Sequence, residues 1–296
     1  MGKNIWSAGV LIAGLLSFSA AAVSSAEAPT VTQSVPQVPV EVMRAETQAP
    51  AIAAWLESVA QFAEFADWRG AKAVTMRRLN APTGEQAAAL WQVERDGREL
   101  GYLVTAPDGN ALYEFSRRPV PTLPAAMQDK LVDNGYLYIG PMMHLAYLNG
   151  TDGLELYNMQ NGETLPTGEL LARMPGLAQE TVADGTRIER DLPRSARPEE
   201  DALYALGLYG MKKGIVPLSA LMERAENNSL NRPTYVVYDA VPDKLRIALA
   251  AERIIRQGDR VLIGVRDPFA LQSQPLVYID SRFPVSAAIL QTSAVQ

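Results

Sequence analysis

The sequence predicts an α+β protein with two small domains, each an antiparallel sheet with packed helices, that follow a signal peptide and a proline-rich tether. Three observations predict this class. The chain is 48% hydrophobic and 20% charged, which is typical of folded domains. Short apolar segments separated by Asp-Gly and Asn-Gly pairs alternate with a few helical patterns. The length of 296 residues is close to the point where one hydrophobic core divides into two.

Residues 1–28 predict a secretory signal peptide. Lys3 is the only charged residue before Glu27, and an apolar run over 8–23 lies between them. The small residues that follow end in an Ala-x-Ala site, so we expect cleavage after Ala28, with Ala26 as the other candidate. An uncleaved membrane anchor is the alternative, but the apolar run is shorter than the roughly 20 residues that a spanning helix needs.

Residues 29–50 predict an extended linker. They hold several prolines among Thr, Val, Gln and Ser, without a helical or strand period. With the signal peptide, this pattern predicts a protein that is secreted or held in the cell envelope. We expect no stable membrane span after the signal peptide is cleaved.

The first domain is predicted over residues 51–175 and begins with a helix from Ala51. Its apolar residues recur at helical intervals, and Gly70 follows the end of the pattern. We expect this stripe to pack into a core, with a partner-binding groove as the alternative. The periodic residues are Ile52, Trp55, Leu56, Val59, Phe62 and Ala63.

A β-meander is predicted after this helix, because short apolar runs are separated by Asp-Gly pairs that tolerate a positive φ. The strands are expected at 71–79, 90–93, 102–105 and 111–115, with turns at Asp96-Gly97 and Asp108-Gly109. A short helix at 124–133 and strands at 136–139, 143–148 and 154–157 complete the domain.

The second domain is predicted over residues 195–296, after a proline-containing irregular segment. Its expected order is helix, helix, strand, helix, strand, strand, with a further strand at 285–290. The third helix is predicted from Pro242 to a cap at Gly258, with Glu252 and Arg256 one turn apart. The other elements are expected at 199–209, from 217, at 234–238, at 261–265 and at 276–279.

Composition excludes several kinds of chemistry. The 33 acidic residues outnumber the 27 basic ones, which argues against a nucleic-acid binder. The chain has no Cys and one His, so thiol nucleophiles, disulfides, Cys-ligated metals and His-pair zinc motifs are excluded. Dinucleotide and phosphate-loop glycine patterns and the Gly-x-Ser-x-Gly elbow do not occur. We therefore predict no catalytic residues, no metal and no cofactor.

The one histidine, His144, lies in an apolar strand-like run over 142–148. We expect a histidine with satisfied hydrogen bonds or one on an edge strand, and a Ser-His dyad is the alternative. The acidic run 199–201 is expected to stabilise a helix N-terminus. Residues 149–153 are expected to form a plain turn, because they lack the full calcium-loop spacing.

Segments of the last third follow a known order of parts. Residues 197–210 contain small and apolar residues that close on Tyr-Gly, 258–265 place a Gly turn before an apolar strand, and 274–280 supply another apolar strand. This order resembles the papain-like cysteine peptidases of the bacteriocin-processing type, found in secreted bacterial proteins. The resemblance implies a Cys at the start of the helix and a His at the start of the last strand. Arg197 and Gln274 stand near those positions instead.

The first domain is similar to the propeptide-like modules that precede such peptidases. The residues that carry this similarity are Trp68–Ala71, Gly101–Val104 and Leu112–Ser116.

Papain-like chemistry needs a thiolate beside an imidazole, so the resemblance implies a degenerate peptidase, a pseudoenzyme without catalysis. We expect a secreted, non-catalytic protein that binds a peptide or protein in a cleft near Arg197 and Gln274. One alternative is a cell-envelope binding or scaffold protein with no peptidase ancestry. A hydrolase that uses paired carboxylates is the other.

Overall fold

The computed structural model describes residues 50–165, 187–206, 215–227, 229–241, 245–270, 273–282 and 286–289. The chain divides into two units, Met1–Val42 and Met43–Gln296, and every described residue belongs to the second. The predicted signal peptide, and the linker up to residue 49, lie outside the described residues. None of the helices in the described part has both the length and the apolar character needed to cross a membrane.

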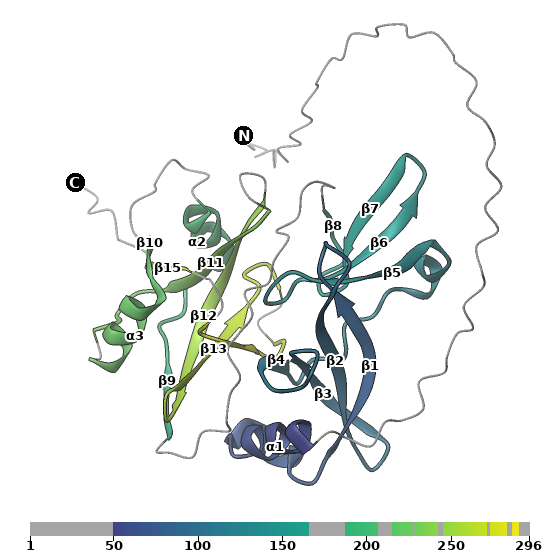
Figure 1. The fold of residues 1–296 in the computed structure, drawn as a ribbon. Helices are drawn as coiled ribbons and strands as arrows, with labels where there is room; N and C mark the ends of the chain where they lie inside the picture. The colour runs from purple at the N-terminus through teal and green to yellow at the C-terminus, as the bar shows by residue number, and fades with distance from the viewer. Residues whose placement is uncertain are drawn as a thin grey trace, which may run out of the picture. The chain divides into compact units, whose positions relative to one another are not determined.

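The described residues form a mostly-β structure with a few short helices, and their strands join in one 15-stranded mixed sheet (Figure 1). The strands are β1 (Lys72–Asn80), β2 (Gln86–Arg95), β3 (Arg98–Thr105), β4 (Leu112–Ser116), β5 (Leu131–Tyr138), β6 (His144–Gly150), β7 (Gly153–Asn158), β8 (Thr164–Leu165), β9 (Arg187–Asp191), β10 (Ile215–Pro217), β11 (Thr234–Val241), β12 (Leu245–Gln257), β13 (Arg260–Arg266), β14 (Val277–Asp280) and β15 (Ser286–Ile289). The order is β10-β15-β11-β12-β13-β14-β4-β3-β2-β1-β5-β6-β7-β8, with β9 paired to β12.

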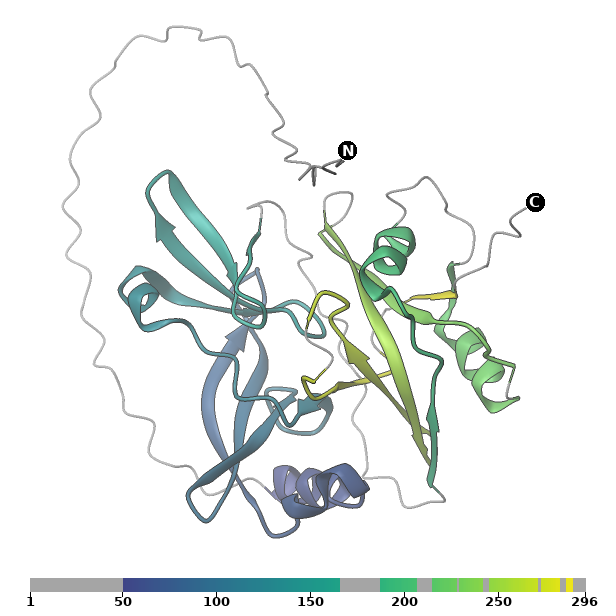
Figure 2. The same cartoon turned by 180° about the vertical axis from the view of Figure 1, so that it is seen from behind.

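Two antiparallel meanders make up the centre of this sheet. Strands β1 to β4 pair in sequence, and strands β11 to β14 do the same. The last strands of the two meanders pair with each other, with Phe115 of β4 opposite Tyr278 of β14. In both views β11–β13 and β1–β3 lie on opposite sides of β4 (Figures 1 and 2).

The prediction of two domains with separate antiparallel sheets is therefore wrong in this respect, because one sheet runs through both. Every residue of strands β4 and β14 is buried, so an open edge on either would leave backbone groups without partners. Their pairing satisfies those groups. One core cluster also contains side chains of both meanders, including Leu90 and Val104 with Ile263 and Val265.

The first meander follows its prediction closely. The turn between β2 and β3 has φ of 54° at Asp96 and 74° at Gly97, as the Asp-Gly pair predicts. The helix before it is confirmed as α1 (Pro50–Val59), followed by the 3-10 helix η1 (Ala63–Trp68). Both pack their aromatic residues against β4 and β14, where Phe65 lies 5.1 Å from Phe115 between ring centroids.

The predicted helix over 124–133 is shorter than expected. The 3-10 helix η2 (Ala125–Lys130) ends there because Leu131 already pairs with Leu148 at the start of β5. In the last third, α2 (Pro198–Ala205) and α3 (Leu218–Glu226) begin near their predicted positions.

The helix predicted over 242–257 is wrong, because Leu245–Gln257 is the long strand β12. A register shift between Ala251 and Arg253 puts a bulge in the strand. The buried residues of β12 recur in pairs every three positions. This spacing of apolar residues is close to that of one face of a helix. Gly258 has φ of 58° and belongs to the β12–β13 turn rather than to a helix cap.

Gly101 tests the close packing of β3 on β4. It has φ of +149°, and a Cβ there would lie 2.1 Å from the Ser116 carbonyl oxygen and 2.9 Å from the Trp68 ring. We expect Gly101→Ala to lower the free energy of unfolding by about 2–4 kcal/mol in urea denaturation. Gly84→Ala is the control, since Gly84 has φ of +90° and no atom within 4 Å of its added Cβ. Equal losses in the two variants would contradict this packing.

Candidate functional site

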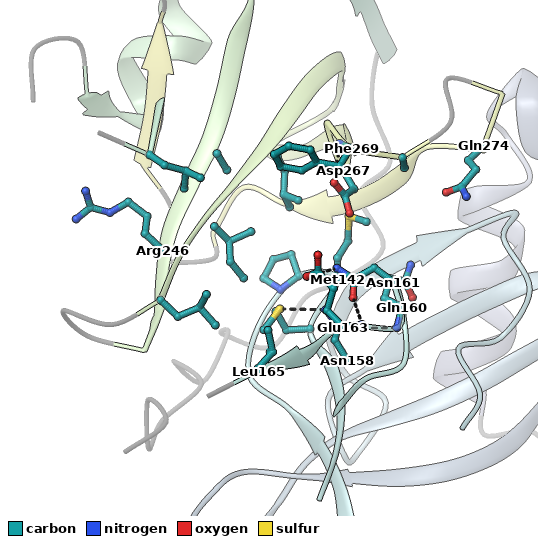
Figure 3. A pocket seen from close by; sticks show the side chains of 18 of the residues that line it. Met142, Asn158, Gln160, Asn161, Glu163, Leu165, Arg246, Asp267, Phe269 and Gln274 are labelled. Carbon is teal, nitrogen blue, oxygen red and sulfur yellow. Dashed lines mark hydrogen bonds between the residues drawn. The ribbon is translucent and has the colours of Figure 1, made fainter. Parts of the chain in front are cut away.

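A cavity of about 470 Å³ lies where residues of the two meanders and the β5–β8 segment come together (Figure 3). Its wall is built from residues 141–143 between β5 and β6, 158–165 from the end of β7 to β8, 245–249 at the start of β12, and 267–270 with Gln274 between β13 and β14. Arg118 and Leu206 also contribute. This volume falls in the range of small-molecule sites in proteins.

The described wall combines amide, acidic and apolar side chains. Figure 3 shows Asn158, Gln160, Asn161 and Glu163 together on one side, Asp267 and Phe269 on another, and Gln274 apart from both groups. The Phe269 ring is 63% exposed although it is large and apolar. The amides are Asn158, Gln160, Asn161 and Gln274, and the apolar side chains include Met142, Met143, Leu165, Ile247 and Leu249.

Arg118 is the buried charge of this wall, with a relative exposure of 7%. It follows β4, and its backbone N–H donates to the Ser116 hydroxyl at 3.1 Å. Its Nε donates to the Pro275 carbonyl at 2.9 Å, which ties it to the strand β14 side of the cavity. Its Nη2 is buried and has no hydrogen-bond partner among the described residues. Burial lowers the pKa of Arg118.

The loop that carries Met142 into the wall is held from both sides. Met142 has φ of +60°, a left-handed conformation that costs a non-glycine residue about 1–2 kcal/mol. Its backbone N–H donates to Glu114 Oε2 at 2.9 Å. The Tyr238 hydroxyl of β11 donates to the Pro141 carbonyl at 2.7 Å. The two contacts hold this conformation in place and fix the wall of the cavity.

Behind this loop lies a buried polar cluster centred on Glu114 of β4. The Tyr102 and Tyr138 hydroxyls donate to its carboxylate at 3.1 and 3.0 Å. His144 Nε2 lies 2.5 Å from Glu114 Oε1, and both side chains have zero exposure. The cluster reaches the cavity through Gln160, whose Nε2 donates to the Tyr102 hydroxyl at 3.3 Å.

The cluster stabilises the ionised form of Glu114. Burial acts to raise its pKa, but the charge and hydrogen bond of His144, with the Met142 and Tyr138 donors, outweigh burial and lower the pKa of Glu114. Burial, and then the charge of Glu114, raise the pKa of Tyr102 and Tyr138 well above the ordinary tyrosine value. Both hydroxyls therefore keep their protons and donate.

The prediction for His144 is confirmed only in part: it is a buried strand residue whose Nε2 contacts a hydrogen-bond partner, but its buried Nδ1 has no partner among the described residues. The partner is the carboxylate of Glu114, so the Ser-His alternative is wrong for this contact. Sequence reasoning missed Glu114 and Arg118. The one available signal for Glu114 was a charged residue inside the apolar run Leu112–Phe115, which becomes a fully buried strand.

Of the two residues predicted to lie in a cleft, Gln274 lines the cavity and Arg197 does not. Gln274 lines the cavity, and its side chain points toward the other labelled residues in Figure 3. The Arg197 side chain is 72% exposed just before α2 and lies 3.2 Å from the Glu200 carboxylate. Arg197 is not among the described residues that line the cavity.

Metal ligands do not gather in the part of the chain that the structure describes: it has no group of three or more His, Cys, Asp or Glu side chains placed to hold a metal ion.

Comparison of the chain with protein families, with curated proteins and with solved structures finds no match in any of the three.

Glu114→Gln tests whether the buried carboxylate stabilises the fold. We expect the variant to lose about 2–4 kcal/mol of unfolding free energy near pH 7, because a paired buried charge is removed. The folded pKa of Glu114 lies below its unfolded value, so its contribution is present above the unfolded pKa and is lost as pH falls through the folded pKa. The difference between wild type and variant should therefore shrink from about pH 7 to about pH 3.

Denaturation of both proteins across that pH range measures the effect. Glu155→Gln, at an exposed position of β7, is the control and should follow the wild type at every pH. A Glu114→Gln difference that stays constant or grows on acidification would contradict the stabilising role of the carboxylate.

Proposed function

We propose that this chain is a secreted or cell-envelope binding protein without catalytic activity, which takes a short peptide in the described cavity. The observation that carries the proposal is a cavity of about 470 Å³ whose wall holds a buried arginine beside several amides. A concave site that combines apolar side chains with polar groups able to fix the orientation of a ligand is a common form of small-ligand site.

The lining favours a peptide over a purely apolar ligand. Side-chain amides both donate and accept hydrogen bonds, so they match the N–H and C=O groups of a peptide backbone. Met142 and Met143 provide flexible apolar surface that adapts to different side chains. The exposed Phe269 ring at the cavity gives a bound peptide an aromatic face to pack on.

A degenerate papain-like origin remains part of this proposal. It is supported by the packing of α2 on the antiparallel strands β11 and β12, through Ala202 and Ala205. That is the arrangement of helix and sheet that the sequence resemblance implies. Gln274 also lies in the cavity wall, whereas Arg197 does not. A scaffold protein with no peptidase ancestry would keep the same fold and bind nothing in the cavity.

A carboxylate-based hydrolase is the second candidate, because Glu163 and Asp267 line the same cavity. Glycosidases of that kind use two carboxylates on opposite sides of the bond that breaks. Hydrolysis of a glycoside panel that is lost in both Glu163→Gln and Asp267→Asn would favour this candidate over a binding protein.

Equilibrium dialysis against a random tripeptide library, read by mass spectrometry, tests the proposal. We expect a subset of tripeptides to be retained by the wild type. Ala270→Trp should abolish retention, because Ala270 is half-buried in the cavity wall and an indole would fill the space. Ala53→Trp, at an exposed position of α1, is the matched control and should bind normally. No retention by the wild type, or equal retention by Ala270→Trp, would refute the proposal.

Phe269 should contribute directly to affinity. We expect Phe269→Ala to weaken binding of the retained tripeptides about tenfold, as truncation of an aromatic contact residue usually does. Leu154→Ala is the control, since Leu154 is also a large exposed apolar residue, 55% exposed, and does not line the cavity. Isothermal titration of both variants measures the effect, and matching affinities in them would exclude Phe269 from the site.

A further inference from the structure

Arg118 is positioned in the cavity wall as a rigid group. Its backbone is held by Ser116, whose hydroxyl in turn donates to the Leu276 carbonyl at 2.8 Å. Its Nε donates to the carbonyl of Pro275, the residue before Leu276. The Nε atom of Arg118 is therefore held by the carbonyl before β14. Its backbone is held by the Ser116 hydroxyl at the end of β4. A side chain held at both ends loses little freedom when a ligand binds.

The same guanidinium keeps hydrogen-bonding capacity. Among the described residues Arg118 forms no ion pair, and its Nη2 has no acceptor although it is buried. The charges of Asp267 and Glu114 act on Arg118, but neither carboxylate reaches ion-pair distance of it, and nor does Glu163. A buried arginine normally has an anion as a partner, because its charge has been removed from water. The position of Arg118 thus points to an anionic group on the ligand.

The chemistry of the wall selects among anions. A guanidinium and a carboxylate match in a planar, two-bond geometry. Arg118 and Arg246 balance Asp267 and Glu163 in the formal charge of the wall, and a single carboxylate disturbs that balance less than a dianion such as phosphate. Because the charge of Asp267 acts on Arg118 itself, Glu163 is the residue suited to the ammonium group at the other end of a peptide. A zwitterionic peptide therefore fits the charges of the wall better than phosphate.

We propose that Arg118 binds the terminal carboxylate of the peptide, so that the cavity recognises free peptide C-termini. This inference rests on the proposed peptide-binding function. It assigns a polarity to the ligand, with the C-terminus at the β4–β14 junction and the rest of the peptide toward the amides and Phe269.

The first test uses the wild-type protein and changes only the ligand. Tripeptides retained from the library are resynthesised as free acids and as C-terminal amides, and their affinities are measured by isothermal titration. We expect the amides to bind at least about tenfold more weakly, since the charge-assisted hydrogen bonds are lost. Equal affinity of acid and amide would overturn the inference and leave the proposed function intact. If no tripeptide binds in either form, the proposed function itself fails.

The second test places the effect at Arg118. In Arg118→Gln the difference between acid and amide should disappear, and Arg118→Lys should retain only part of it, because lysine keeps the charge without the planar fork. Arg98→Gln is the control, since Arg98 is at an exposed position of β3 and is not among the described residues that line the cavity. A full acid preference in Arg118→Gln, or its loss in Arg98→Gln, would overturn the assignment.

Discussion

The buried carboxylate of Glu114 joins more elements of this structure than any other polar group described above. It accepts hydrogen bonds from β3, β5, β6 and the loop before β6, through Tyr102, Tyr138, His144 and the Met142 amide. An ionised carboxylate with zero exposure is tolerated only when its acceptor positions are filled. These elements must therefore meet at one point. The left-handed Met142 and the cavity wall that it forms follow from that requirement.

Glu114 also lies on the strand at which the two meanders meet. The second meander alone does not provide the wall of the cavity, because residues 158–165 belong to the β5–β8 segment while residues 245–249, 267–270 and Gln274 come from the second meander. The pairing of β4 with β14 brings these segments together and places Arg118 directly beyond the junction. The site is thus a consequence of one long sheet, and two separate sheets would not form it.

Local features of the fold could be predicted from the sequence, because they depend on nearby residues. The Asp96-Gly97 turn, the first helix and the burial of His144 are examples. Strand β12 could not, since its apolar residues have a spacing close to that of a helix and only pairing with β11 and β13 identifies it as a strand. The β4–β14 pairing joins residues more than 150 positions apart, and nothing local signals it. For the same reason sequence reasoning missed Glu114 and Arg118.

A crystal structure of the wild-type protein with a retained tripeptide tests whether the junction of the two meanders forms a peptide site with Arg118 at one end. We expect a peptide in the described cavity, with its terminal carboxylate within hydrogen-bond distance of the Arg118 guanidinium and contacts to residues on both sides of the β4–β14 junction. A peptide bound elsewhere, for example on the surface around Arg197, or bound in the cavity with its N-terminus at Arg118, would contradict it.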